Sequence, residues 1–304
     1  MLPAFSFNRL IVCALSFIFS ACHLAASPKI WEEVSGEQAF AHVQQLVDFG
    51  PRPSGSDALE KSRTYIEKQL SILGWKVTRQ VFSDDTPRGK IQFVNLIAQF
   101  GDRGARTPPP SFLLCSHYDT KFFDTIAFVG ANDGGSSTGL LLELARVLGK
   151  HPDQARKIAL VFFDGEEAVK DFSDTDGLYG SRYFARQLAE TKTTKQYRGG
   201  ILFDMIGDRS LNVTMPPDSP AEMARDIFAS ADALKLRTHF TYFDGGITDD
   251  HTPLNAIGIP TVDLIDFDFP WWHTAEDKID KVSAESLRVV GSVAAYDLSE
   301  FVLR

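Results

Sequence analysis

Two adjacent glutamates that follow a short apolar run are the first candidates for chemistry. The run 158–163 consists of aliphatic and aromatic residues, and Glu166 and Glu167 follow it closely. Such a run predicts a strand that is buried on both faces of a parallel sheet. Ligands of open parallel sheets bind beyond the carboxyl ends of the strands, so these two carboxylates should face a crevice.

The same arrangement of an apolar run followed by polar side chains recurs three times. The runs and side chains are 112–115 with His117 and Asp119, 200–203 with Asp204, and 261–265 with Asp266 and then His273. Because the carboxyl ends of parallel strands meet at one edge, we expect these side chains to gather there. Oxygen and imidazole ligands, with no cysteine among them, suit a divalent metal such as zinc in a catalytic site.

Several individual residues allow two interpretations. Glu166 and Glu167 point in different directions, so one can bind a metal while a partly desolvated neighbour transfers protons; an isolated pair would more often be a solvated loop. Asp133 lies in the glycine-rich stretch 128–135, which could wrap round an ion or form a turn that caps the next helix. His273 follows the aromatic stretch 269–272, which predicts a small substrate pocket, although a lone histidine is more often structural.

Strands alternate with helices from residue 112 onwards, which predicts a parallel sheet between layers of helices. We expect strands at 76–82, 91–100, 112–115, 158–163, 200–204, 238–243 and 261–265, and helices from 36, at 59–73, 140–148, 178–188, 221–234 and 284–302. The sequence therefore predicts one α/β domain over 27–304, with a mixed, mostly parallel central sheet flanked by helices.

Composition and the first residues restrict the class of protein. With 304 residues and 44% apolar content the chain can bury a sizeable core, and its net charge of -9 gives no reason to expect a nucleic-acid partner. Residues 1–26 predict a signal for export, too short to span a membrane stably. Phe19-Ser20-Ala21-Cys22 resembles a bacterial lipoprotein signal, which predicts either a lipid anchor on Cys22 or cleavage near Ala26.

An exported protein would then be a periplasmic or outer-membrane lipoprotein, or a secreted one. Removal of the leader leaves Cys115 as the single thiol, and its apolar strand predicts a buried, structural role.

Six ordered motifs together resemble the animal-type glutaminyl cyclases, which are glutaminyl-peptide cyclotransferases on the zinc aminopeptidase scaffold. The motifs are His117-Tyr118-Asp119, Gly130-Ala131-Asn132-Asp133, Phe163-Asp164-Gly165-Glu166-Glu167-Ala168, Leu178-Tyr179-Gly180-Ser181-Arg182, Asp249-Asp250-His251 and Trp272-His273-Thr274. The resemblance extends from about residue 112 to residue 277.

The resemblance implies one zinc per chain, held by Asp133, Glu167 and His273 with a fourth position left open. It implies that Glu166 takes a proton from the α-amine of an N-terminal glutamine and passes it to departing ammonia, which leaves pyroglutamate. Asp249 and Asp204 would complete the hydrogen-bonded network, and Trp272, Phe269 and Phe172 would contact the substrate. The expected partners are peptides or proteins with N-terminal glutamine, bound by a monomer.

The chain departs from the family pattern at three positions, and three other functions compete. Phe172 stands where tryptophan is usual, Gly134 replaces a serine and Asp263 replaces a histidine, while Cys115 has no disulfide partner. A di-zinc aminopeptidase would use His117 and Asp204 as ligands of a second metal. A serine hydrolase is suggested by the pattern at 135–139, and a non-catalytic binding module could keep the same scaffold.

Overall fold

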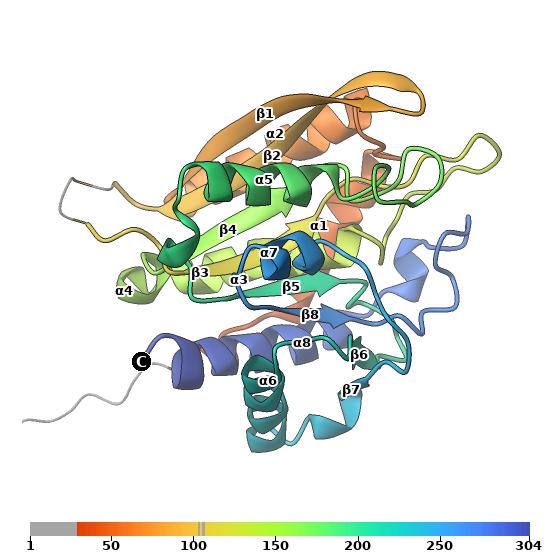
Figure 1. The fold of residues 1–304 in the computed structure, drawn as a ribbon. Helices are drawn as coiled ribbons and strands as arrows, with labels where there is room; N and C mark the ends of the chain where they lie inside the picture. The colour runs from red at the N-terminus through yellow and green to blue at the C-terminus, as the bar shows by residue number, and fades with distance from the viewer. Residues whose placement is uncertain (1–28, 103, 105–106) are drawn as a thin grey trace, which may run out of the picture.

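The computed structural model describes residues 29–102, 104 and 107–304 (Figure 1). The predicted leader 1–26 and its Cys22 therefore lie outside the described residues. In the described part the helices are α1 Gly36–Asp48, α2 Asp57–Ile72, α3 Gly135–Gly149, α4 Pro152–Ala155, α5 Tyr179–Glu190, α6 Ala221–Ala233, α7 His251–Ala256 and α8 Ala284–Asp297. The strands are β1 Trp75–Thr86, β2 Gly89–Phe100, β3 Phe112–His117, β4 Ile158–Phe163, β5 Gly200–Asp204, β6 Val213–Met215, β7 Phe240–Tyr242 and β8 Thr261–Ile265.

The central sheet confirms the predicted mixed, mostly parallel architecture of a single α/β domain. Among the described residues six strands pair in the order β1-β2-β4-β3-β5-β8. Strands β4, β3, β5 and β8 run parallel, whereas β1 and β2 form a long antiparallel hairpin that pairs with β4. The strand register aligns apolar residues of neighbouring strands: Cys115 of β3 lies opposite Val161 of β4 and Leu202 of β5.

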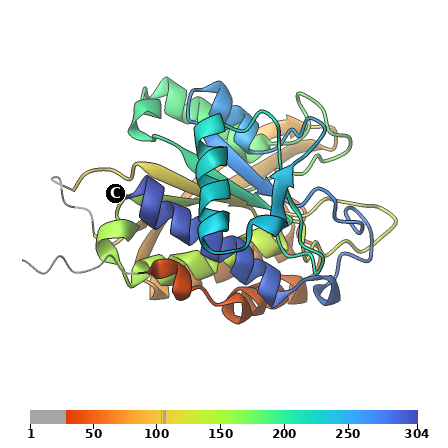
Figure 2. The same cartoon turned by 90° about the horizontal axis from the view of Figure 1, so that it is seen from below.

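Alternation along the strands produces two apolar faces, and each face is covered by helices. Leu113, Cys115, Val161 and Leu202 pack with Phe184 and Leu254, which belong to α5 and α7. The opposite face, which includes Leu114, Leu160, Phe203 and Leu264, packs against α1, α2, α3, α6 and α8. Figure 2 shows the sheet between these two layers. Cys115 is fully buried, as expected, and burial raises the pKa of its thiol well above the ordinary value.

Local sequence explains how the main helices begin. Ser35 and Ser56 lie just before α1 and α2, and their hydroxyls accept hydrogen bonds from the backbone N–H of Gln38 and Leu59 at 3.3 and 3.1 Å. These bonds satisfy donors that a helix end leaves free. Gly134 precedes α3 with φ +72°, a conformation that glycine adopts readily, so α3 starts directly after Asp133.

The structure differs from the sequence-based expectations mainly in short elements. Strand β6 pairs with β7 in a small parallel ribbon, and neither β6 nor helix α7 was predicted. Helix α3 begins at Gly135, five residues before the predicted start, and α8 is followed by a π-helical turn at Leu298–Val302. Across 29–102, 104 and 107–304, none of the helices combines the length and the apolar character that crossing a bilayer requires.

Candidate metal centre and active site

The carboxyl ends of the parallel strands bring the predicted polar side chains to one edge of the sheet. His117 is the last residue of β3, Asp204 is the last residue of β5, and Glu166 and Glu167 follow β4. Asp133 is added from the turn that opens α3. The loop after β8 contributes His273, so segments separated by more than a hundred residues meet at this edge.

The first cluster consists of Asp133, Glu167 and His273. His273 Nε2 lies 3.1 Å from Glu167 Oε1 and 3.4 Å from Asp133 Oδ2. Asp133 and Glu167 are buried, and His273 is partly exposed toward the cavity described below. The structure thus brings together the three residues that the family resemblance assigns to zinc.

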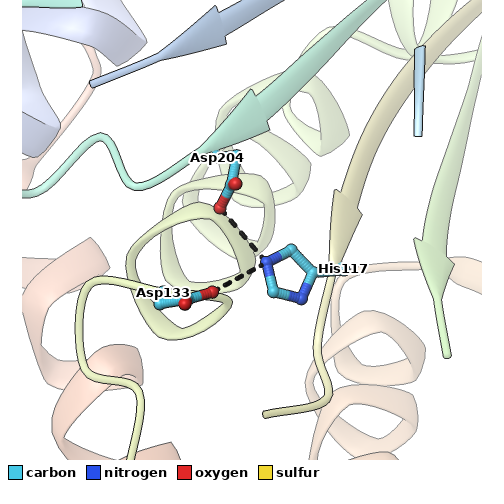
Figure 3. A group of neighbouring side chains, drawn as sticks. All are labelled: His117, Asp133 and Asp204. Atoms are coloured by element: carbon cyan, nitrogen blue, oxygen red, sulfur yellow. Dashed lines mark hydrogen bonds and ion pairs between the residues drawn. The ribbon is translucent and has the colours of Figure 1, made fainter. Parts of the chain in front are cut away.

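The second cluster shares Asp133 with the first (Figure 3). His117 Nε2 lies 3.3 Å from Asp133 Oδ1 and 3.1 Å from Asp204 Oδ1. The two oxygens of Asp133 therefore face different histidines, as a carboxylate between two cation positions would.

The spacing of both clusters fits a divalent metal. Zinc bonds of about 2.0–2.1 Å in tetrahedral geometry separate two ligand atoms by about 3.3 Å, and the separations here run from 3.1 to 3.4 Å. Asp133 Oδ2 is buried, and no hydrogen-bond donor satisfies it among the described residues. An imidazole and carboxylate set of this kind suits zinc.

Two further buried carboxylates hold the ligand-bearing turns in place. Asp277 accepts hydrogen bonds from the backbone N–H of Asn132 and Asp133 at 2.8 and 3.1 Å. Asp119 accepts from the backbone N–H of Glu166 and Glu167, both at 3.2 Å. The backbone at Asp133 and at Glu167 is therefore fixed by a carboxylate that does not itself belong to the clusters.

Arg52 is a fully buried cation that neighbours this acidic site. It is 0% exposed and donates to the carbonyl oxygens of Leu46, Gly50, Tyr118, Val129 and Gly130 at 3.2, 3.4, 3.4, 2.7 and 3.0 Å. Burial lowers its pKa to about 10, although the charges of Asp277, Asp119 and Asp133 act in the opposite direction. Arg52 thus joins the loop after α1 to the turn that leads to Asp133.

A cavity of about 400 Å³ opens beside the first cluster. Glu166, Asp204 and Asp249 contribute polar groups to it, and Phe172 and Trp272 contribute aromatic walls. Burial raises the pKa of Glu166, His117 lowers it, and Glu167 and Asp249 raise it again, so that it stands well above its ordinary value. A raised pKa makes this carboxylate a better proton acceptor than an ordinary glutamate.

The predicted substrate-binding residues differ in their positions. Phe172 and Trp272 line the cavity and are 49% and 43% exposed. The described residues that line the cavity do not include Phe269, which is buried with Met205, Ile247 and Ile265. Its ring therefore supports the wall from behind instead of forming its surface. Phe267, which the sequence did not single out, lines the cavity and its ring lies 5.2 Å from that of Trp272.

A third group of buried polar side chains lies next to the cavity. Ligand atoms of Asp249, His251 and Asp263 all lie within 4.8 Å of one another, and His251 Nδ1 is 3.4 Å from Asp263 Oδ2. Asp263, one of the departures from the family pattern, is therefore a direct neighbour of Asp249.

The position of the serines argues against a serine hydrolase. Ser137, the would-be nucleophile of 135–139, is fully buried and its hydroxyl contacts the Gly134 carbonyl oxygen at 3.4 Å. Neighbouring Ser136 donates to the Asn132 carbonyl oxygen at 2.6 Å. Both hydroxyls thus stabilise the start of α3, and among described residues neither lines the cavity.

Sequence reasoning missed Arg52 and Asp277. Arg52 stands between two prolines in a stretch that otherwise indicates only a break between helices, and Asp277 stands in a polar loop. Their roles depend on long-range contacts with the 128–133 turn. The one signal in the sequence was the position of Arg52 between two prolines. A charged residue there has few local partners, so its partners must come from distant segments.

Comparisons with known proteins agree with this geometry. Residues 95–297 match peptidase family M28. The chain is 31% identical to the glutaminyl-peptide cyclotransferase of Dictyostelium discoideum, over 85% of this chain and 84% of that protein. The crystal structure of Acidobacteriales bacterium glutaminyl cyclase superimposes with a TM-score of 0.79 at 32% identity, covering 87% of this chain and 94% of the other.

A Zn-dependent exopeptidase from Parabacteroides distasonis gives the same TM-score of 0.79 at 26% identity, covering 88% of this chain and 98% of that one. The scaffold is thus shared by cyclases and peptidases, and the identities of 31% and 32% to these two cyclases exceed the 26% identity to the exopeptidase. The chain belongs to peptidase family M28 and, within it, to the glutaminyl-peptide cyclotransferases.

Proposed function

We propose that the protein is a zinc-dependent glutaminyl-peptide cyclotransferase, which converts an N-terminal glutamine to pyroglutamate and releases ammonia. The observation that carries this proposal is the meeting of Asp133, Glu167 and His273 beside Glu166 in a cavity of about 400 Å³. Family membership supports the same activity. Substrates would be peptides or proteins with an accessible N-terminal glutamine.

Asp133, Glu167 and His273 would hold one zinc per chain, and such an ion polarises the side-chain carbonyl of the substrate glutamine. The reaction forms a bond between the α-amine nitrogen and the side-chain carbonyl carbon, and it breaks the bond from that carbon to the amide nitrogen. Glu166 takes the proton of the attacking amine and delivers it to the departing nitrogen, which leaves as ammonia. No proton is gained or lost overall by Glu166.

Positioning supplies much of the rest, because the nucleophile already belongs to the substrate. Trp272 and Phe172 would contact the substrate, and Phe269 would support that wall. Asp249 and Asp204 also line the cavity and would orient Glu166 and the reacting amine. The charge of Asp249 raises the pKa of Glu166, which helps this carboxyl group to hold the proton between the two transfers.

The test is Glu166→Gln, assayed with a glutamine-initiated peptide. Because glutamine has nearly the same shape but cannot accept the amine proton, we expect loss of turnover by at least about a hundredfold with zinc content unchanged. The readouts are the mass loss of ammonia and metal analysis of the same sample. An active variant would remove Glu166 from the mechanism.

A di-zinc aminopeptidase is the second candidate, because the His117, Asp133 and Asp204 cluster has the same ligand spacing as the first. In that case Glu166 would activate water to cut a peptide bond. The cyclase proposal predicts that His117→Gln keeps one zinc whereas His273→Gln loses it. Two zinc ions in the unmodified protein, with release of free amino acids, would favour the peptidase.

We propose that the protein is exported, which the composition of residues 1–26 supports, and that it is a monomer. The mass of the mature amino terminus distinguishes cleavage near Ala26 from lipid attachment at Cys22, and light scattering tests the monomer. The net charge of -9 supports the absence of a nucleic-acid partner.

A further inference from the structure

The loop between β4 and α5 shapes the mouth of the cavity. Its residues Lys170, Asp171 and Phe172 line the cavity, and the Phe172 ring is half-exposed. When the N-terminal glutamine of a substrate lies beside Glu166, the second residue of the peptide must lie in this mouth. The conformation of the loop therefore decides which side chains contact that second residue.

Asp176, near the end of this loop, accepts hydrogen bonds from several other residues of the loop and from Tyr179. Its Oδ1 accepts from the Val169 N–H at 2.7 Å and from the Tyr179 hydroxyl at 2.8 Å. Its Oδ2 accepts from the Lys170 and Asp171 N–H groups at 2.9 and 3.0 Å. The side chain is only 3% exposed, so these four donors take the place of water around the charge.

Both ends of the loop are fastened to the active site. The Leu178 N–H donates to the Glu166 carbonyl oxygen at 2.8 Å, and the Lys121 ammonium donates to the Ala168 carbonyl oxygen at 3.0 Å. The middle of the loop has fewer such ties to the catalytic residues. Next to Phe172, the Asp176 carboxylate holds the backbone of Asp171 on one side, and the Asp176 backbone exchanges hydrogen bonds with the Ser173 backbone at 2.9 and 3.3 Å on the other.

Phe172 is in turn packed against the residue next to Asp176. A Cβ atom added to Gly177 would lie 2.8 Å from two carbons of the Phe172 ring, and Gly177 has φ +117°. A side chain at this position is disfavoured both by the backbone and by the ring. The glycine thus leaves the space in which the ring rests.

We propose that Asp176 is a positioning residue that holds Phe172 at the cavity mouth and so sets the affinity for an apolar residue after the substrate glutamine. This inference rests on the proposed cyclotransferase function. Asp176 does not touch the reacting atoms, so its effect should appear in substrate binding, and the chemical step should be largely unaffected. Through it, the enzyme should prefer glutamine followed by a large apolar side chain.

The test compares Asp176→Asn with Asp174→Asn, an exposed position in the same loop with the same change in charge. Two peptide amides serve as substrates, one beginning Gln-Phe and the other Gln-Gly. The amide nitrogen that replaces one carboxylate oxygen cannot accept hydrogen bonds, so the backbone N–H bonds to that oxygen are lost. We therefore expect Asp176→Asn to raise KM for the Gln-Phe peptide about tenfold, with kcat changed less than about twofold and KM for Gln-Gly changed less than about threefold. Asp174→Asn should match the unmodified enzyme.

A double-mutant cycle with Phe172→Ala separates positioning from general damage. In the Phe172→Ala background, Asp176→Asn should no longer raise KM for the Gln-Phe peptide. A full additional increase in that background, or equal loss of kcat on both peptides, would overturn the proposal. If Asp176→Asn does not fold, Gly177→Ala displaces the same ring and should give the same selective rise in KM. If the unmodified enzyme forms no pyroglutamate, the proposed function itself is contradicted. If the enzyme is active but these variants leave KM for the Gln-Phe peptide unchanged, only the role of Asp176 is contradicted.

Discussion

Replacement of Arg52 by methionine should strongly destabilise the protein. Methionine fills much of the same space but donates no hydrogen bonds, so the carbonyl oxygens of Leu46, Val129 and Gly130 lose donors that lie at 3.2, 2.7 and 3.0 Å. Hydrogen bonds to a charged group contribute about 1.5–3 kcal/mol each. For these three bonds the sum is about 4.5–9 kcal/mol, which is an upper bound because the guanidinium also no longer has to be desolvated.

We therefore expect a loss of about 4 kcal/mol in the free energy of unfolding, in the range found when one partner of a buried charged network is removed. For a domain of this size such a loss lowers Tm by roughly 8 °C. Arg52→Lys keeps the charge but cannot reach the separate carbonyls together, so its loss should be about half as large. Exposed Arg225→Met on α6 is the matched control and should stay within about 0.5 kcal/mol.

The assay is thermal and denaturant unfolding of the metal-free protein, followed by zinc titration. Because Arg52 holds the turn that precedes Asp133, zinc affinity should fall together with stability. A Tm for Arg52→Met within about 2 °C of the unmodified protein, with unchanged zinc affinity, would refute the reasoning. It would mean that the five carbonyls find water or other donors at little cost.

Two further predictions concern pH and metal. Burial, followed by the charge of Asp226, raises the pKa of Asp297 to about 7 from an ordinary value of 3.8. As pH falls, the folded state therefore takes up a proton before the unfolded state does. This group thus makes the protein more stable as pH falls from about 7 toward 4, by at most about 4 kcal/mol. Asp297→Asn should be more stable than the unmodified protein at pH 8 and should lose that advantage by pH 5, and an equal difference at both pH values in denaturant unfolding would contradict this. Chelation should abolish cyclisation and lower Tm, because a ligand that binds only the folded state, at a thousand times its Kd, adds about 4 kcal/mol to the free energy of unfolding. Added zinc should restore both activity and Tm. An unchanged Tm after verified metal removal would argue against a structural contribution of the ion.

Sequence alone predicted the parts of the fold in which one physical signal dominates. The runs that form β3, β4, β5 and β8 are mostly apolar because both faces of the sheet are covered, although Asp263 lies within β8, and their ends placed His117 and Asp204 correctly at one edge. Short elements carry too few residues for a pattern to stand out, which is why β6 and α7 were not predicted.

Contacts between distant residues could not be read from local patterns. Phe269 and Trp272 belong to one aromatic stretch, yet only Trp272 faces the cavity, because this stretch is an irregular loop without the regular alternation of a strand. The dependence of Asp133 on Asp277 and Arg52 likewise joins segments far apart in the chain. Side-chain direction in loops and long-range hydrogen bonds are therefore what the structure adds.

The packing of α1 against α8 has a consequence for how the chain reaches its native state. Gly36 in α1 approaches the backbone of Ala284 in α8 so closely that an added Cβ would collide with its carbonyl oxygen, and α1 also packs on α3. The ribosome synthesises α1 long before α8, so the part of the apolar face of α1 that packs on α8 stays exposed until α8 has been synthesised. Completion of the domain must therefore follow the emergence of its last long helix, and a nascent chain halted before that point should be handled by chaperones or proteases as an unfinished protein.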